Sequence, residues 1–280
     1  MKARLTDWLQ RLLRGRGYAL VRVQGDAQEP WRGDPCALRA RLDVVPRTAV
    51  MPIAIARAST RPILDDANPL YRAAREGLGA TDAEARRERI HACLAAAITA
   101  ETATTGAAKL GLAPGSVPRL DAAPPWVNWY PWHRVSLEQR IASTNAQIRI
   151  DNAKGGVTLD GYGGGGYGSR DARRVAAETQ RLWRLLASIE RHGYRRSGGV
   201  DADIGGRLLV ASSGDCRWML AGGYHRLSVL AALGHETVLV RIKGVIREDD
   251  APHWAAVTGG EYPEAAAREV FRNVFHAGEV

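Results

Sequence analysis

Apolar residues recur at two different spacings along the chain, and each spacing predicts a different kind of element. Intervals of three and four residues, which place side chains on one face of a helix, predict helices, whereas alternation of apolar and polar residues predicts strands. The helical intervals are about 6–14, 69–77, 81–99, 103–110, 136–151, 171–191, 227–233 and 263–275, and the strand intervals are 18–23, 208–210, 216–220 and 237–242.

Local signals mark where several of these elements begin and end. The run Thr81-Asp82-Ala83-Glu84 has the capping-box pattern at the start of the helix over 81–99. Gly193 and Gly234 follow the helices over 171–191 and 227–233, as expected of residues that end a helix. Residues 24–68 carry scattered prolines and charges with weak periodicity, so they predict an irregular connector.

These patterns divide the chain into three intervals. Residues 1–68 combine a basic amphipathic helix with the connector, residues 69–153 are mainly helical, and residues 154–280 mix strands with helices. The predicted fold class is α+β, a mixed sheet with helices that follows a mainly helical and irregular N-terminal region. The basic and Trp/Leu faces of the first helix, within residues 1–23, suit either a membrane surface or docking on the rest of the protein or a partner subunit.

Two unusual stretches each allow two interpretations. Residues 124–133 contain Trp126, Trp129 and Trp132 among prolines, and these rings either stack on a base or sugar or pin a loop against the core. Residues 161–168 are almost all glycine and lack the Gly-Lys-Ser/Thr ending of a Walker A loop. This glycine run is either a linker or a lid over a site.

Residues 207–243 carry the clearest chemical signal. They predict a hairpin, the glycine turn Gly222-Gly223-Tyr224-His225-Arg226, a helix and a further strand. Two glycines between a strand and a helix let a ligand approach the backbone closely, and the free N–H groups of the helix favour an anion. Arg226 adds a planar fork suited to phosphate, and His225 adds a donor or a proton shuttle. The turn therefore predicts a phosphate site.

The C-terminal part of the chain resembles the ParB/sulfiredoxin superfamily. The resemblance rests on a helix ending in a glycine turn, a hairpin strand, the phosphate turn and a following strand, here Leu186–Gly193, Arg217–Leu220, Gly222–Arg226 and Val238–Val240. With Asp201–Ile204 and the tail from Trp254 to Phe275, the chain looks most like bacterial ParB-like proteins of uncharacterised function. The superfamily binds nucleoside triphosphates on this turn, so the resemblance implies ATP or CTP, with Mg²⁺.

The chain departs from each branch of that superfamily. Sulfiredoxins carry a catalytic cysteine where this chain has Tyr224, and without a thiolate their chemistry lacks its nucleophile. ParB proteins continue into a helix-turn-helix domain, whereas the residues after Lys243 predict one helix, over 263–275. The carboxylate base of the kinase branch has no counterpart that can be aligned in this sequence.

Composition and charge limit the binding partners and the cellular compartment that we expect for the chain. The 280 residues carry a net charge of +9, and the first 80 hold 14 basic and 8 acidic residues, which permits contact with nucleic acid or anionic lipid without specifying either. No apolar run is long enough to span a bilayer, and residues 1–23 lack the apolar core of a secretory signal. Three widely spaced cysteines fit a reducing compartment, so we expect a cytoplasmic protein, with a peripheral membrane location as the alternative.

The expected function is a nucleotide-dependent phosphotransferase or NTPase that acts on an unknown small-molecule acceptor. Gly222, Gly223, Tyr224, His225 and Arg226 would bind the phosphates, with His225 moving a proton. Asp201 and Asp203 would hold Mg²⁺ or act as the base, or simply cap a turn. The alternatives are a nucleotide-gated binding module without turnover and a nucleic-acid-binding ParB-like protein.

Overall fold

The fold is known for five stretches of the chain. The computed structural model describes residues 32–37, 47–100, 104–154, 172–194 and 203–279, all within the unit Trp31–Val280. The predicted helix at 6–14, the strand at 18–23 and the glycine run at 161–168 lie outside the described residues.

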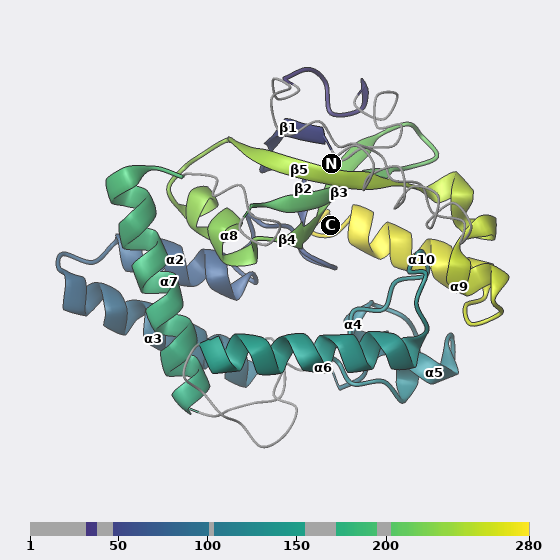
Figure 1. The fold of residues 1–280 in the computed structure, drawn as a ribbon, viewed down its shortest axis with the longest axis horizontal. Coiled ribbons are helices and arrows are strands. Elements are labelled where there is room, and N and C mark those ends of the chain that lie inside the picture. The colour runs from purple at the N-terminus through teal and green to yellow at the C-terminus, as the bar shows by residue number, and fades with distance from the viewer. Residues whose placement is uncertain (1–31, 38–46, 101–103, 155–171, 195–202, 280) are drawn as a thin grey trace, which may run out of the picture. The chain divides into compact units, whose positions relative to one another are not determined.

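Five strands of the described chain form one mixed sheet, in the order β1-β5-β3-β4-β2 (Figure 1). β3 lies at its centre, antiparallel to β4 and parallel to β5, while β1 pairs antiparallel with β5 and β2 pairs parallel with β4. The protein is therefore α+β with a mixed sheet. The strands are β1 (Arg47–Pro52), β2 (Ala56–Arg57), β3 (Gly205–Val210), β4 (Cys216–Gly222) and β5 (Thr237–Arg247).

Helices surround this sheet in two groups. α2, α3, α7 and α8 pack on one another, and α10 packs on the short η2 segment. Figure 1 shows the first group at one end of the sheet, α10 near the other end and α6 running beneath the sheet. The helical elements are α2 (Pro69–Leu78), α3 (Ala83–Ala100), α4 (Gly106–Lys109), α5 (Pro118–Asp121), α6 (Leu137–Lys154), α7 (Ala172–His192), α8 (Tyr224–Ala232), η2 (Glu248–His253), α9 (Ala255–Thr258) and α10 (Glu264–Phe275).

The two faces of the sheet bury two separate hydrophobic cores. Leu208 and Trp218 belong to the core shared with α2, α3, α7 and α8, whereas Leu209 and Met219 belong to the core shared with residues 107–137 and α10. Successive residues of a strand point to opposite faces, so β3 and β4 alternate between the two cores. All four of these side chains are at most 4% exposed.

Most predicted elements are confirmed, but the predicted connector is wrong over 47–57. These residues form β1 and β2, and Ala49 and Met51 are fully buried. The alternation in this short segment is obscured by Pro52, which lies at the end of the edge strand β1, where proline is tolerated. The sheet is consequently not confined to residues 154–280, because the first core draws on all three predicted intervals.

Three helix starts also differ from the prediction. Asp82, not Thr81, caps α3, because its carboxylate accepts hydrogen bonds from the backbone N–H groups of Glu84 and Ala85. The predicted helix over 103–110 shortens to α4, which is capped by Thr105. The helix predicted from Leu227 begins three residues earlier, at Tyr224.

The tryptophan-rich loop is part of the second core. Trp129 is fully buried and Trp132 is 7% exposed, and Trp132 contacts Trp254 edge-on with the ring centroids 5.1 Å apart. The Trp129 indole N–H donates to the Val135 carbonyl, and the Tyr262 hydroxyl donates to the Trp129 carbonyl. Of the two interpretations, the loop-pinning one is therefore correct for Trp129 and Trp132.

Because the two cores share the strands of one sheet, we predict that they unfold together. We expect Leu208→Ala and Leu209→Ala each to lower the free energy of unfolding by about 2–5 kcal/mol, since each leaves a cavity in a closed core. Because both side chains belong to β3, urea unfolding followed by tryptophan fluorescence and by circular dichroism should show one shared transition for each variant. Leu64→Ala, at a side chain that is 46% exposed, is the control and should change stability little. Separate transitions by the two probes would contradict the coupling of the two cores.

Candidate functional site

The α8 turn, defined here as Gly222–Arg226, joins β4 to α8. Gly223 has φ +85°, a left-handed conformation that favours glycine, and a Cβ there would lie 3.0 Å from the Ile204 Cα. Gly222 is exposed, and a Cβ built on it would meet nothing within 4 Å. Gly223 is therefore required by the fold, while Gly222 leaves open space beside the turn.

The N-terminus of α8 carries free hydrogen-bond donors. No side chain caps it, and the first helical bond runs from the Leu227 N–H to the Gly223 carbonyl. The N–H groups of Tyr224, His225 and Arg226 precede this bond, so they have no partner within the helix. Together with the helix dipole they create a partial positive charge at the turn.

His225 is held by a carboxylate from a different helix. Its Nε2 lies 2.6 Å from Oε2 of Glu178 on α7, and the other oxygen of Glu178 accepts from Arg181 at 3.2 Å. Burial by itself would raise the pKa of Glu178, but the hydrogen bond from His225 and the charges of His225 and two arginines outweigh it and leave the pKa below its ordinary value. This contact uses Nε2 of His225 and does not involve Nδ1.

Two arginines near this pair lack a partner among the described residues. Arg174, one helical turn before Glu178 on α7, is only 6% exposed, yet its Nε and Nη1 atoms have no hydrogen-bond partner. Burial lowers its pKa, which the charge of Glu178 partly offsets. Arg226 is half-buried in the first turn of α8 and has no hydrogen bond or ion pair with the described residues. Both guanidinium groups have donors to offer an anion.

Tyr224 differs from the rest of the turn. It packs against the first core, and burial raises its pKa to about 12, with a smaller opposing effect from Arg61. The neutral phenol at this position has the bulk to support the turn. It does not supply the thiolate that the sulfiredoxin branch uses here.

The two predicted aspartates are only partly placed. Asp201 lies outside the described residues, whereas Asp203 is buried, 8% exposed, and precedes Ile204, the residue against which Gly223 packs. The structure thus brings Asp203 into the neighbourhood of the α8 turn. No group of three or more His, Cys, Asp or Glu side chains in the described ranges is arranged to hold a metal ion. The described residues do not by themselves form a Mg²⁺ site.

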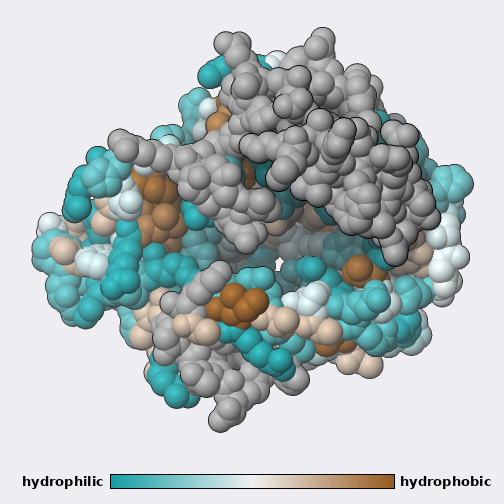
Figure 2. All heavy atoms as spheres, viewed as in Figure 1, coloured by the Kyte–Doolittle hydropathy of each residue, from teal (hydrophilic) through white to brown (hydrophobic). Residues whose placement is uncertain are grey.

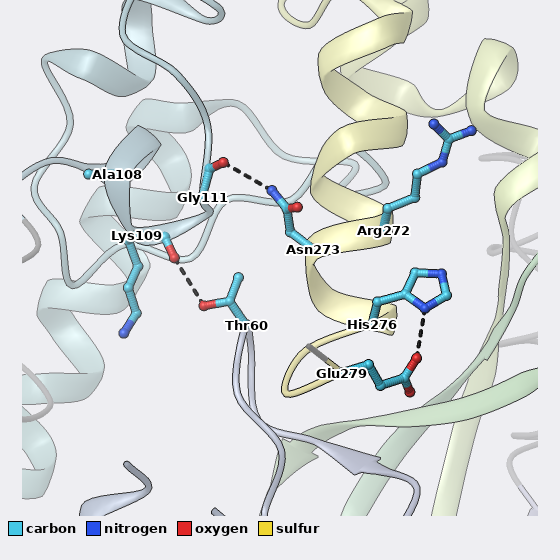
Figure 3. Close-up of a pocket in the computed structure, with 8 residues that line it drawn as sticks. All are labelled: Thr60, Ala108, Lys109, Gly111, Arg272, Asn273, His276 and Glu279. Atoms are coloured by element: carbon cyan, nitrogen blue, oxygen red, sulfur yellow. Dashed lines mark hydrogen bonds and ion pairs between the residues drawn. The ribbon is translucent and has the colours of Figure 1, made fainter.

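A pocket of about 440 Å³ lies elsewhere, between the end of α4 and α10 (Figure 3). Its charged groups already have partners: Arg272 pairs with Glu248, and His276 pairs with Glu279. Hydrogen bonds from His276 and Arg217 lower the pKa of Glu279 to about 2. Glu279 also pairs with the buried Arg57, which donates to the Phe275 carbonyl and so ties β2 to the end of α10. The charged residues around this pocket therefore hold β2, η2 and α10 together.

Glu178 and Arg174 are the site residues that sequence reasoning missed. Glu178 stands 47 residues before His225, so no local spacing links them. A helical wheel of 171–191 would have placed Glu178 beside the buried positions Val175 and Leu182, three and four residues away. A carboxylate on the buried side of a helix was the available signal.

The comparisons with known proteins leave the family open. No protein-family model matches the chain, and no match is found among the curated proteins or the solved structures. None of the helices in the described ranges is long and apolar enough to cross a membrane. The function must therefore be argued from the site itself.

The contact between Glu178 and His225 predicts a pH-dependent stability. Because the pKa of Glu178 is lower in the folded protein than its ordinary value of 4.5, its contribution is present above that value and is lost as the pH falls through the folded pKa. We expect Glu178→Gln to lower the free energy of unfolding by about 1–2 kcal/mol at pH 7, the size of a charge-assisted hydrogen bond.

The measurement is urea unfolding of both proteins from pH 7 down to pH 3, and their difference should shrink below about pH 4.5. Glu269→Gln, at an exposed residue of α10, is the control and should follow the wild type. A difference that stays constant over this range would show that the ionised carboxylate contributes nothing.

Proposed function

We propose that the α8 turn binds the phosphates of a nucleoside triphosphate and that the protein is a nucleotide-dependent phosphotransferase or NTPase. The observation that carries the proposal is the N-terminus of α8, which has no side-chain cap. In its first turn Arg226 has no partner among the described residues, and His225 is held beside it by Glu178. The buried guanidinium of Arg174, whose Nε and Nη1 have no partner among the described residues, adds a second cation near the pair. The resemblance to the ParB/sulfiredoxin superfamily, as a proposal, points to ATP or CTP.

The geometry supports a division of roles. Backbone N–H groups of the turn and the Arg226 fork would bind and orient phosphate oxygens, because both present several donors to one anion. The open space at Gly222 would let the phosphate chain reach the backbone. Phosphoryl transfer depends mostly on such positioning and charge neutralisation.

His225 would handle the proton. In its neutral form, with Nε2–H donated to Glu178, the ring accepts at Nδ1 the proton of an attacking hydroxyl or water. The new P–O bond forms to that oxygen while the bond to the leaving phosphate oxygen breaks, and the proton remains on His225. Glu178 stabilises the resulting imidazolium, the role of the carboxylate in a catalytic triad. No step here is assigned to Mg²⁺, because the described residues do not form its site.

Arg226 provides the first test of the binding part. We expect Arg226→Ala to weaken the binding of ATP or CTP roughly 10- to 100-fold in calorimetry, as the loss of a charge-assisted hydrogen bond to phosphate predicts. ADP and GTP, each with and without Mg²⁺, complete the series. Arg184→Ala, an exposed arginine on α7, is the matched control and should bind as the wild type does. Unchanged affinity in Arg226→Ala would overturn the phosphate assignment.

His225 provides the test of turnover. We expect His225→Asn to retain nucleotide binding within about threefold and to lower phosphate release or transfer roughly 10²-fold or more, the range for loss of a general base. His192→Asn, at an exposed position at the end of α7, is the control. Wild-type protein that binds nucleotide without releasing or transferring phosphate would support the binding module without turnover instead.

A further inference from the structure

A second group of arginines lies close enough together for their charges to act on one another. Arg134 follows the tryptophan-rich loop, Arg140 lies in the first turns of α6, and Arg207 lies on β3. Arg207 is two residues from Leu209 and therefore shares its face of the sheet, the face of the second core. We call these three residues the arginine cluster.

The arginine cluster sits on a fixed frame. The loop before it is pinned by the stacked pair Tyr130 and Trp132, whose ring centroids are 4.9 Å apart. Arg140 donates from Nε to the Asn128 carbonyl at 3.0 Å, which ties α6 to the same loop. Figure 2 shows a hollow in the surface above α6, the helix that carries Arg140. Packed rings and this hydrogen bond thus fix the loop and the start of α6 relative to each other.

The charges in this cluster are not compensated by the described residues. Arg207 is half-buried and has no hydrogen bond or ion pair there, and Arg140 has only the backbone contact. Burial lowers the pKa of Arg207, and the positive charges of Arg134 and Arg140 lower it further. Burial and the charges of Arg140 and Arg207 lower the pKa of the neighbouring His133 to about 3. No described carboxylate offsets these effects.

Like charges that lie close together in a partly buried position repel one another. A bound anion offsets this repulsion and so lowers the energy of the group. Guanidinium forks match the oxygen pairs of carboxylates and phosphates. We propose that Arg134, Arg140 and Arg207 form a binding site for a small molecule that carries two or more carboxylate or phosphate groups.

The arginine cluster lies on the side of the second core, whereas Tyr224 of the α8 turn packs against the first core. Tyr130, in the loop that carries the cluster, is close enough to Tyr224 of the turn to affect its pKa. Anion binding at the arginine cluster is therefore proposed independently of the proposed function.

The experiment uses the full chain with citrate, pyrophosphate and a short oligodeoxythymidylate, each compared with NaCl at equal ionic strength. We expect citrate, pyrophosphate or both to raise the wild-type Tm by roughly 5 °C at millimolar concentration. Whichever acts identifies a carboxylate or a phosphate ligand. Arg207→Met should remove most of that shift, and its own Tm without anion should rise by about 2–4 °C as repulsion is relieved.

Three further variants test whether the Tm shift comes from the arginine cluster. If Arg207→Met fails to fold, Arg134→Ala, at an exposed residue, tests the site in its place. It should reduce the Tm shift caused by citrate or pyrophosphate at least twofold. Arg184→Met should keep the whole shift. Arg226→Ala should also keep the Tm shift but lose nucleotide binding. Failure of the proposed anion site can therefore be distinguished from failure of the proposed nucleotide site. No shift in the wild type, a shift that survives Arg207→Met and Arg134→Ala, or a larger shift with the oligonucleotide than with either small anion would overturn the proposal.

Discussion

The central strand β3 is buried on both faces, and this constraint shapes the rest of the structure. Leu208 faces the core of α2, α3, α7 and α8, while Leu209 faces the core of α10 and the tryptophan-rich loop. A strand in this position carries apolar side chains on alternate faces and leaves little room at its ends. At one end, Gly223 fits against Ile204 only because it lacks a Cβ, and this contact determines where α8 begins.

The position of α8 then decides the electrostatics of the site. Its first turn meets α7, where Glu178 compensates His225 at 2.6 Å. Arg174 and Arg226 near the same contact have no partner among the described residues, and the arginine cluster on the other face of β3 has no compensating carboxylate there. The contrast between one satisfied pair and several unsatisfied cations is what favours anionic ligands in this region.

Much of the fold follows from local patterns in the sequence. The helical spacing of α2, α7 and α10, the hairpin of β3 and β4, and the glycine turn before α8 all appear as predicted. Local rules failed where long-range contacts decide. β1 and β2 gain their hydrogen bonds from strands more than 150 residues later, so their short, proline-flanked segments resemble a connector when read in isolation.

The sequence alone determined the α+β composition, the glycine turn and the close spacing of Tyr224, His225 and Arg226 in that turn. These properties depend on residues that are neighbours along the chain, where backbone geometry sets the distances. Only the tertiary structure decided that Glu178 holds His225, that Nε and Nη1 of Arg174 are buried without a partner among the described residues, and that the charges of Arg140 and Arg207 act on each other. Such contacts depend on how helices and strands pack across the sheet, and the spacing of residues along the chain does not specify which elements meet.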